Sequence, residues 1–172
     1  MDKKYTTKSY KQTQKLGEKL ALRLRSGQAK EILLSRTSQK TAVVLGLSGN
    51  LGGGKTTFLQ GFAKGLGIKD KILSPTFVIM RRFRFNNLAI KQFNNFYHID
   101  CYRINKPEEI LELGFKEIIS DPKNIVAIEW SEKIKKVLPK TTIFINFEFI
   151  DKNKREIKFD IGFVRNIIGL WI

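Results

Sequence analysis

The feature that most constrains this chain is a short glycine-rich segment, GNLGGGKTT, at residues 49–57. Its residues Gly49, Gly54, Lys55 and Thr56 satisfy the pattern G-x-x-x-x-G-K-[ST]. Glycines let the backbone turn its N–H groups toward phosphate oxygens, the lysine reaches the outer phosphates, and the hydroxyl ligates Mg²⁺. The segment therefore predicts a loop that binds a nucleoside triphosphate with magnesium.

The residues on either side of the loop supply the context that this pattern needs. TAVVLGLS at 41–48 is an apolar, β-branched run, typical of a strand buried on both faces of a parallel sheet. A helix is predicted after the loop and can end at Gly65 or Gly67. The order strand, loop, helix disfavours the alternative of a glycine-rich turn that matches by accident. Apolar residues recur at helical spacing in this helix at Phe58, Leu59, Phe62, Ala63 and Leu66.

Further along, apolar patterns predict alternating strands and helices. Apolar residues at helical spacing over 10–24 indicate an amphipathic helix, and KPEEILELGF predicts a second one that starts at Pro107. NNFYHID and NIVAIE are apolar runs that end at Asp100 and Glu129. TTIFINFEFI and REIKFDIGF alternate at period two around DKNK, which predicts a hairpin. Together these elements predict an α/β fold with a mixed, mostly parallel sheet, flanking helices and a C-terminal antiparallel hairpin.

The length and composition are those of one domain. With 172 residues, of which 42% are hydrophobic, we expect a single domain over 1–172 with a core at about 5–163. The stretch 25–40 lacks a clean period and is interpreted as an extended connection, and 164–172 as an apolar tail. No apolar run is long enough to cross a bilayer, and the first residues lack a signal-peptide core. We therefore expect a cytoplasmic protein without a membrane partner.

The composition also limits the chemistry. One cysteine, Cys101, and one histidine, His98, exclude an internal disulfide and a structural zinc cage. The net charge of +16 favours a polyanionic partner or an acidic protein, although the codon bias of an AT-rich genome would also enrich lysine. Dense basic clusters occur only in MRRFRF (Arg81, Arg82, Arg84) and EKIKK (Lys133, Lys135, Lys136). The alternative interpretation of such a cluster is an ordinary solvated face of the protein.

Two acids are candidates for the site beside the loop. Asp100 and Glu129 each end a predicted strand, where ligands gather in open α/β sheets, and either could complete a metal shell or orient water. Alternatively, Asp100 caps a strand and Glu129 pairs with a lysine. His98 is interpreted as an ordinary core or surface histidine rather than a base, and Trp130 as a packing residue rather than one that stacks on a substrate. LSPTF at 73–77 is a plain turn, or a switch segment that uses Ser74 and Thr76.

The ordered set GNLGGGKTT, LSPTF, YHIDCYR, EEILELGF and AIEWSE resembles the bacterial TsaE (YjeE) ATPases, from about Thr13 to Arg155. The resemblance implies a three-layer P-loop ATPase fold and a part in making threonylcarbamoyladenosine next to the anticodon of tRNA. It also implies two partner proteins, TsaB and TsaD, with tRNA reached through their complex. In this family the ATPase is not the transferase, because ATP binding and hydrolysis support turnover of the complex.

Residue by residue, the resemblance assigns Leu51 to Thr56 to the ATP phosphates, Thr56 and Glu129 to Mg²⁺, and Asp100 to a second acidic role near the metal. It places Thr13 near the nucleotide base and matches Arg155 to a basic residue late in the chain that contacts the nucleotide. The chain departs from the family's usual residues at four positions. The family usually has an acid where this chain has Asn50, alanine where it has Gly53, leucine where it has Cys101 and often proline where it has Ser131. The predicted nucleotide-binding residues are Thr13, Gly49, Asn50, Leu51, Gly52, Gly53, Gly54, Lys55, Thr56, Thr57 and Arg155.

Three functions follow from these observations. The leading hypothesis is a Mg²⁺-dependent ATPase, slow without partners, in which Glu129 or Asp100 orients water and Lys55 stabilises charge on the γ phosphate. The second is a P-loop small-molecule kinase, for which MRRFRF is the candidate set of lid arginines. The third is a nucleotide-gated RNA-binding module, which the net charge favours.

Overall fold

The structure is a computed structural model that describes residues 3–26, 41–74, 78–85 and 92–160. Seven strands form one sheet in the order β1-β7-β6-β2-β5-β4-β3. The strands are β1 (Lys3–Thr7), β2 (Val43–Gly49), β3 (Met80–Arg84), β4 (Asn95–Asp100), β5 (Asn124–Glu129), β6 (Ile143–Phe149) and β7 (Arg155–Phe159). The helices are α1 (Tyr10–Arg25), α3 (Lys55–Gly65), α4 (Pro107–Leu111), α5 (Phe115–Ser120) and the 3₁₀ helix η2 (Ser131–Val137).

The middle of the sheet is parallel and its margins are antiparallel. β2 pairs in parallel with both β5 and β6, and β4 pairs in parallel with β5. β3, β7 and β1 pair antiparallel with their neighbours, so the predicted mixed sheet and the predicted β6–β7 hairpin are confirmed. The sequence patterns did not indicate β1, which pairs with β7 at the edge of the sheet. The register sets Asp100 opposite Glu129 at the carboxyl ends of β4 and β5.

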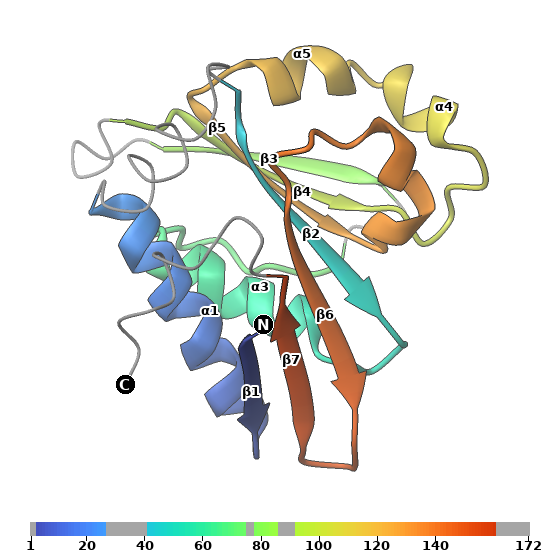
Figure 1. Ribbon diagram of the computed structural model, residues 1–172. Helices are drawn as coiled ribbons and strands as arrows, with labels where there is room; N and C mark the ends of the chain where they lie inside the picture. Colours follow the sequence, from blue (N-terminus) through green and yellow to red (C-terminus); the bar gives the residue numbers. More distant parts are fainter. Residues whose placement is uncertain (1–2, 27–40, 75–77, 86–91, 161–172) are drawn as a thin grey trace.

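One face of the sheet is covered by α1 and α3, which lie side by side (Figure 1). Their backbones approach closely, because a Cβ added at Gly61 would lie 1.8 Å from the carbonyl oxygen of Gln14. A Cβ added at Gly17 would lie 2.1 Å from the carbonyl oxygen of Phe58. This contact is possible only for glycine, and it fixes the start of α3 against α1. The core on this face is rich in phenylalanine and includes Phe58, Phe62, Phe96, Phe147 and Phe159.

The opposite face is covered by three short helices, α4, α5 and η2. Pro107 begins α4 as predicted, but the helix ends at Leu111 instead of continuing through the apolar run. Gly114, with φ of +74°, then precedes a separate helix, α5. A left-handed residue cannot continue an α-helix, which explains the break. The cluster beneath these helices includes the fully buried residues Ile110, Phe115 and Ile134.

Several expectations fall outside the described residues. They concern most of the 25–40 connection, the apolar tail at 164–172, the last residues of the predicted core and Thr76 in LSPTF. Within the described ranges, no helix is both long enough and apolar enough to span a membrane.

Candidate functional site

The glycine loop joins the end of β2 to the start of α3, as the sequence predicted. Gly54 lies immediately before α3 with φ of +98°, a left-handed conformation that favours glycine. The side chain of Thr13 on α1 lies beside it, since a Cβ added at Gly54 would be 3.5 Å from Thr13 Cγ2. The positive, N-terminal end of α3 therefore lies at the carboxyl ends of the parallel strands, close to α1.

Lys55, the first residue of α3, is folded back onto the loop. Its Nζ donates hydrogen bonds to the carbonyl oxygens of Gly49 (2.6 Å) and Asn50 (3.0 Å). The same Nζ lies 4.0 Å from the centroid of the Trp130 ring, a cation–π distance. Burial lowers the pKa of this ammonium, and the nearby carboxylates, Glu129 first, oppose that change. A buried cation of this kind gains from a polyanion that replaces its lost water.

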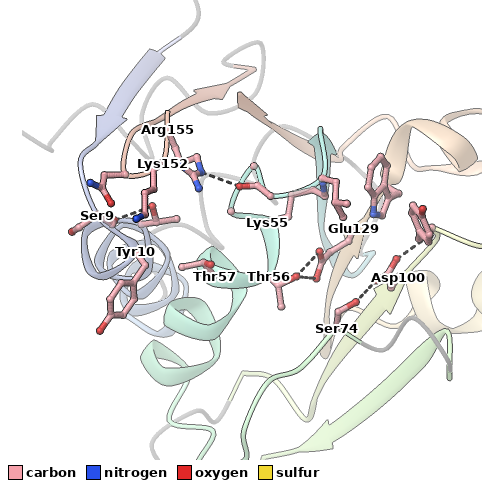
Figure 2. Close-up of a pocket in the computed structure, with 18 residues that line it drawn as sticks. Ser9, Tyr10, Lys55, Thr56, Thr57, Ser74, Asp100, Glu129, Lys152 and Arg155 are labelled. Carbon is pink, nitrogen blue, oxygen red and sulfur yellow. Dashed lines mark hydrogen bonds between the residues drawn. The ribbon is translucent and has the colours of Figure 1, made fainter. Parts of the chain in front are cut away.

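Thr56, Glu129 and His98 form a connected group. Thr56 Oγ1 lies 2.9 Å and 2.8 Å from the two carboxylate oxygens of Glu129, so one face of α3 meets the end of β5 (Figure 2). His98 Nε2 lies 2.9 Å from Glu129 Oε1. His98 is fully buried and Glu129 is 3% exposed. The structure thus brings together the hydroxyl and the acid that the sequence proposed as metal ligands.

Asp100, at the end of β4, has a different environment. Its Oδ1 accepts a hydrogen bond of 2.9 Å from the backbone N–H of Tyr102, and its Oδ2 accepts one from Ser74 Oγ. Ser74 belongs to LSPTF, so the residue nominated for a switch segment contacts the second acid (Figure 2). Asp100 and Glu129 therefore line the site from adjacent strands, each held by a different partner.

These residues surround a cavity of about 540 Å³ at the carboxyl ends of the parallel strands. Of the predicted residues, Gly49 and Asn50 are not among those that line it, and their carbonyl groups bind Lys55 instead. The cavity brings together the predicted residues Thr13, Leu51, Gly52, Gly53, Gly54, Lys55, Thr56, Thr57, Asp100, Glu129 and Arg155. It is also lined by Ser9, Tyr10, Ser74, Tyr102, Trp130, Lys152 and Asn153.

The end of the cavity away from the two acids is built by α1 and the β6–β7 hairpin. Arg155 Nε donates to the carbonyl oxygen of Gly52 at 2.9 Å, and its guanidinium lies 4.5 Å from the centroid of the Phe149 ring. Thr13 is buried, and its hydroxyl lies 2.8 Å from that of Thr7. Arg155 thus ties the hairpin to the glycine loop (Figure 2).

Sequence reasoning missed several lining residues for identifiable reasons. Ser9 precedes α1, and Tyr10 was interpreted only as part of the apolar period of that helix. Lys152 and Asn153 belong to DKNK, which was interpreted only as a turn. His98 is spaced by two from Asp100 on a strand, and that spacing puts both side chains on one face of the sheet. This spacing was an available signal that His98 faces the site, although it does not indicate the contact with Glu129.

The side chains at the site offer oxygen atoms to the implied magnesium ion. Within the described residues, no group of three or more His, Cys, Asp or Glu side chains could hold a metal by itself. Burial raises the pKa of Cys101 to about 12, and its side chain is not among those that line the cavity. A hydroxyl and a carboxylate in contact form a partial set of oxygen ligands, which Mg²⁺ completes with water and phosphate oxygens. The residues present therefore fit Mg²⁺ bound together with a phosphorylated ligand.

The arginines that the kinase hypothesis predicted as a lid lie outside the cavity. Arg81, Arg82 and Arg84 are on the edge strand β3, and none of them lines the cavity. Arg82 Nε instead donates to Asn95 Oδ1 at 2.9 Å.

Comparison with known proteins gives consistent results. The chain is 41% identical over 124 residues to the tRNA threonylcarbamoyladenosine biosynthesis protein TsaE of Rickettsia felis, covering 72% of this chain and 67% of that protein. It is 36% identical over 121 residues to the protein of that name from Haemophilus influenzae, covering 70% and 72%. The crystal structure of Bacillus subtilis YdiB superposes with a TM-score of 0.65 and 27% identity, covering 92% of this chain and 86% of that one. The family model for the threonylcarbamoyl adenosine biosynthesis protein TsaE matches residues 7–157, and the chain therefore belongs to the TsaE family.

Proposed function

We propose that this protein is a Mg²⁺-dependent ATPase that supports a tRNA-modifying complex making threonylcarbamoyladenosine. Membership of the TsaE family gives it a role in the biosynthesis of that nucleoside. The observation that carries the ATPase proposal is the contact of Thr56 Oγ1 with both oxygens of Glu129, beside the glycine loop and inside the cavity. This contact joins the two oxygen ligands that a nucleotide-bound Mg²⁺ requires from a P-loop protein.

In this proposal the backbone N–H groups of the loop and the start of α3 hold the phosphates of ATP. The Lys55 ammonium exchanges the carbonyl oxygens of Gly49 and Asn50 for the outer phosphates. Because burial has already stripped this ammonium of water, the ion pair with phosphate is stronger than at a hydrated surface. Lys55 thereby stabilises the negative charge that develops on the γ phosphate.

The two acids have separate tasks. Thr56 and Glu129 would hold Mg²⁺, which neutralises phosphate charge when it is bound. Asp100, one strand away, orients the attacking water, while Ser74 and the Tyr102 N–H hold its carboxylate in place. Thr13 and Arg155 contact the nucleotide at the opposite end of the cavity.

The partners in this proposal are TsaB and TsaD, and tRNA is reached through their complex in the cytoplasm. Hydrolysis by the isolated protein is slow in this proposal, because a partner protein completes the site. The P-loop small-molecule kinase is less well supported, since its candidate lid arginines on β3 do not line the cavity.

The test is ATP hydrolysis by the purified protein, alone and with TsaB and TsaD of the same organism. We expect slow basal hydrolysis that the partners stimulate, and a loss of about a hundredfold in Glu129→Ala. Lys55→Ala should lose nucleotide binding or turnover. Glu112→Ala, which removes an exposed carboxylate on the opposite face, serves as the matched control.

Unchanged hydrolysis in Lys55→Ala and Glu129→Ala would refute the ATPase assignment. ATP binding without stimulation by TsaB and TsaD would refute the partner assignment. ATP consumption that depends on an added metabolite would instead establish the kinase.

A further inference from the structure

His98 is a buried polar residue that the proposed reaction does not use. It lies in β4, two residues before Asp100, and its side chain is fully buried on the face of the sheet that α1 and α3 cover. Its Nε2 lies 2.9 Å from Glu129 Oε1. Its other ring nitrogen, Nδ1, is also buried and has no hydrogen-bond partner within the described part of the chain. A polar ring in this position calls for a physical explanation, because an apolar residue would pack there without an unpaired atom.

The contact dictates which ring nitrogen carries hydrogen. A carboxylate oxygen only accepts hydrogen bonds, so Nε2 must carry the hydrogen and donate it to Glu129. If Nδ1 carried the hydrogen instead, the ring would bury an unpaired donor and turn a lone pair toward the carboxylate. The geometry therefore fixes the ring with its hydrogen on Nε2.

The contact also determines how Glu129 is held. Thr56 reaches both carboxylate oxygens from α3, whereas His98 reaches only Oε1 and does so from the neighbouring strand. A hydroxyl has one hydrogen and two lone pairs, so Thr56 can keep donating to Glu129 while a lone pair binds a cation. His98 holds the same carboxylate from the neighbouring strand, and this hydrogen bond needs no rearrangement when a cation binds.

We infer that His98 is a positioning residue that orients Glu129 for magnesium through an Nε2–H···Oε1 hydrogen bond. The inference rests on the proposed function, because it gives the Thr56–Glu129 pair a supporting residue. Removal of hydrogen bonds that orient a metal ligand typically weakens metal affinity by about 10–100-fold. We expect loss of His98 to weaken magnesium-dependent nucleotide binding by the same factor and to leave nucleotide binding without magnesium unchanged.

The first test measures binding of the non-hydrolysable ATP analogue AMPPNP by calorimetry, once with MgCl₂ and once with EDTA. The wild-type protein should bind more tightly with magnesium. His98→Leu should lose about tenfold or more of that gain and keep its affinity in EDTA. His98→Gln, whose side-chain amide can donate, should recover part of the gain. Phe96→Leu, at a buried apolar position two residues earlier in β4, is the control for lost packing and should retain it.

The second test determines which ring nitrogen of His98 carries the hydrogen. His98 is the single histidine of the chain, so ¹⁵N-labelled imidazole gives an NMR spectrum that needs no assignment. The wild-type protein should show the hydrogen on Nε2, and Glu129→Ala should change that signal. This measurement does not require the variants at position 98 to fold.

The outcomes separate the inference from the function on which it rests. Full magnesium dependence in His98→Leu, an equal loss with and without magnesium, or a ring with its hydrogen on Nδ1 would overturn the role of His98 alone. A wild-type protein that gains nothing from magnesium would overturn the metal site, and the inference with it.

Discussion

The two faces of the sheet are covered in very different ways. On one face, α1 with 16 residues and α3 with 11 lie in backbone contact through glycines and cover a core that contains seven phenylalanines. On the other face, α4, α5 and η2 have 5, 6 and 7 residues and cover a smaller, mostly aliphatic cluster. The side chains of His98, Asp100 and Glu129 and the start of α3 all belong to the first face. The site is therefore built where the packing leaves least freedom, which suits groups that must hold a fixed geometry.

If the first face is packed more specifically, equal truncations on the two faces should have unequal effects. Phe58→Ala should lower the free energy of unfolding by about 4–5 kcal/mol, because Phe58 also contacts the rings of Phe147 and Phe159, with centroids 5.5 and 6.3 Å away. Phe115→Ala, at an equally buried position on α5, should cost about 3 kcal/mol. Urea unfolding of both variants measures the difference. Equal losses would contradict the comparison.

Glycine substitutions should separate packing from backbone conformation. Gly61→Ala should cost about 3 kcal/mol, because the new Cβ would lie 1.8 Å from the carbonyl oxygen of Gln14 and force α1 and α3 apart. Gly114→Ala should cost about 1 kcal/mol, since its Cβ would meet only the end of Glu117 at 3.7 Å and the loss comes from φ of +74°. Thermal unfolding of the two variants provides the measurement. A smaller loss for Gly61→Ala than for Gly114→Ala would show that the helix contact relaxes easily.

The same contrast explains what could be predicted from the sequence. The strand, loop and helix around 41–66 follow from local patterns, because apolar periodicity and glycine chemistry act within a few residues. β1 could not be predicted, since KKYTT carries no apolar pattern and becomes a strand only by pairing with β7. The break between α4 and α5 depends on the single left-handed residue Gly114, which a periodic apolar run conceals.

The site divides in the same way. Lys55 and Thr56 were identified from a contiguous motif, and Asp100 and Glu129 from the rule that ligands gather at strand ends. The contact of His98 with Glu129 could not be read from either pattern, because it depends on the lateral register of two strands. Lys152 and Asn153 reach the cavity only because the β6–β7 hairpin folds over the glycine loop.

The smallest expected effect concerns Glu18, which pairs with one lysine on its own helix α1 and with another on α3. Glu18 on α1 lies 3.1 Å from Lys15 Nζ and 3.4 Å from Lys64 Nζ on α3. The hydrogen bond from Lys15, followed by the charges of Lys15 and Lys64, lowers the pKa of this carboxyl below its ordinary 4.5. A carboxyl whose pKa is lowered in the folded state stabilises the fold above the unfolded pKa, and this stability is lost as the pH falls through the folded pKa.

Glu18→Gln should therefore cost about 0.5 kcal/mol at pH 7 and almost nothing once the pH has fallen below the lowered pKa of the wild-type carboxyl. Because the pairs are partly exposed, 1 M salt should reduce the difference at pH 7 as well. Asp70→Asn, an exposed change outside the helices and strands, should alter stability much less at either pH. Urea unfolding at several pH values compares the three proteins. A cost for Glu18→Gln that persists unchanged in acid would mean that Glu18 contributes by packing against α3, and the close approach of the two helices would then rest on contacts other than charge.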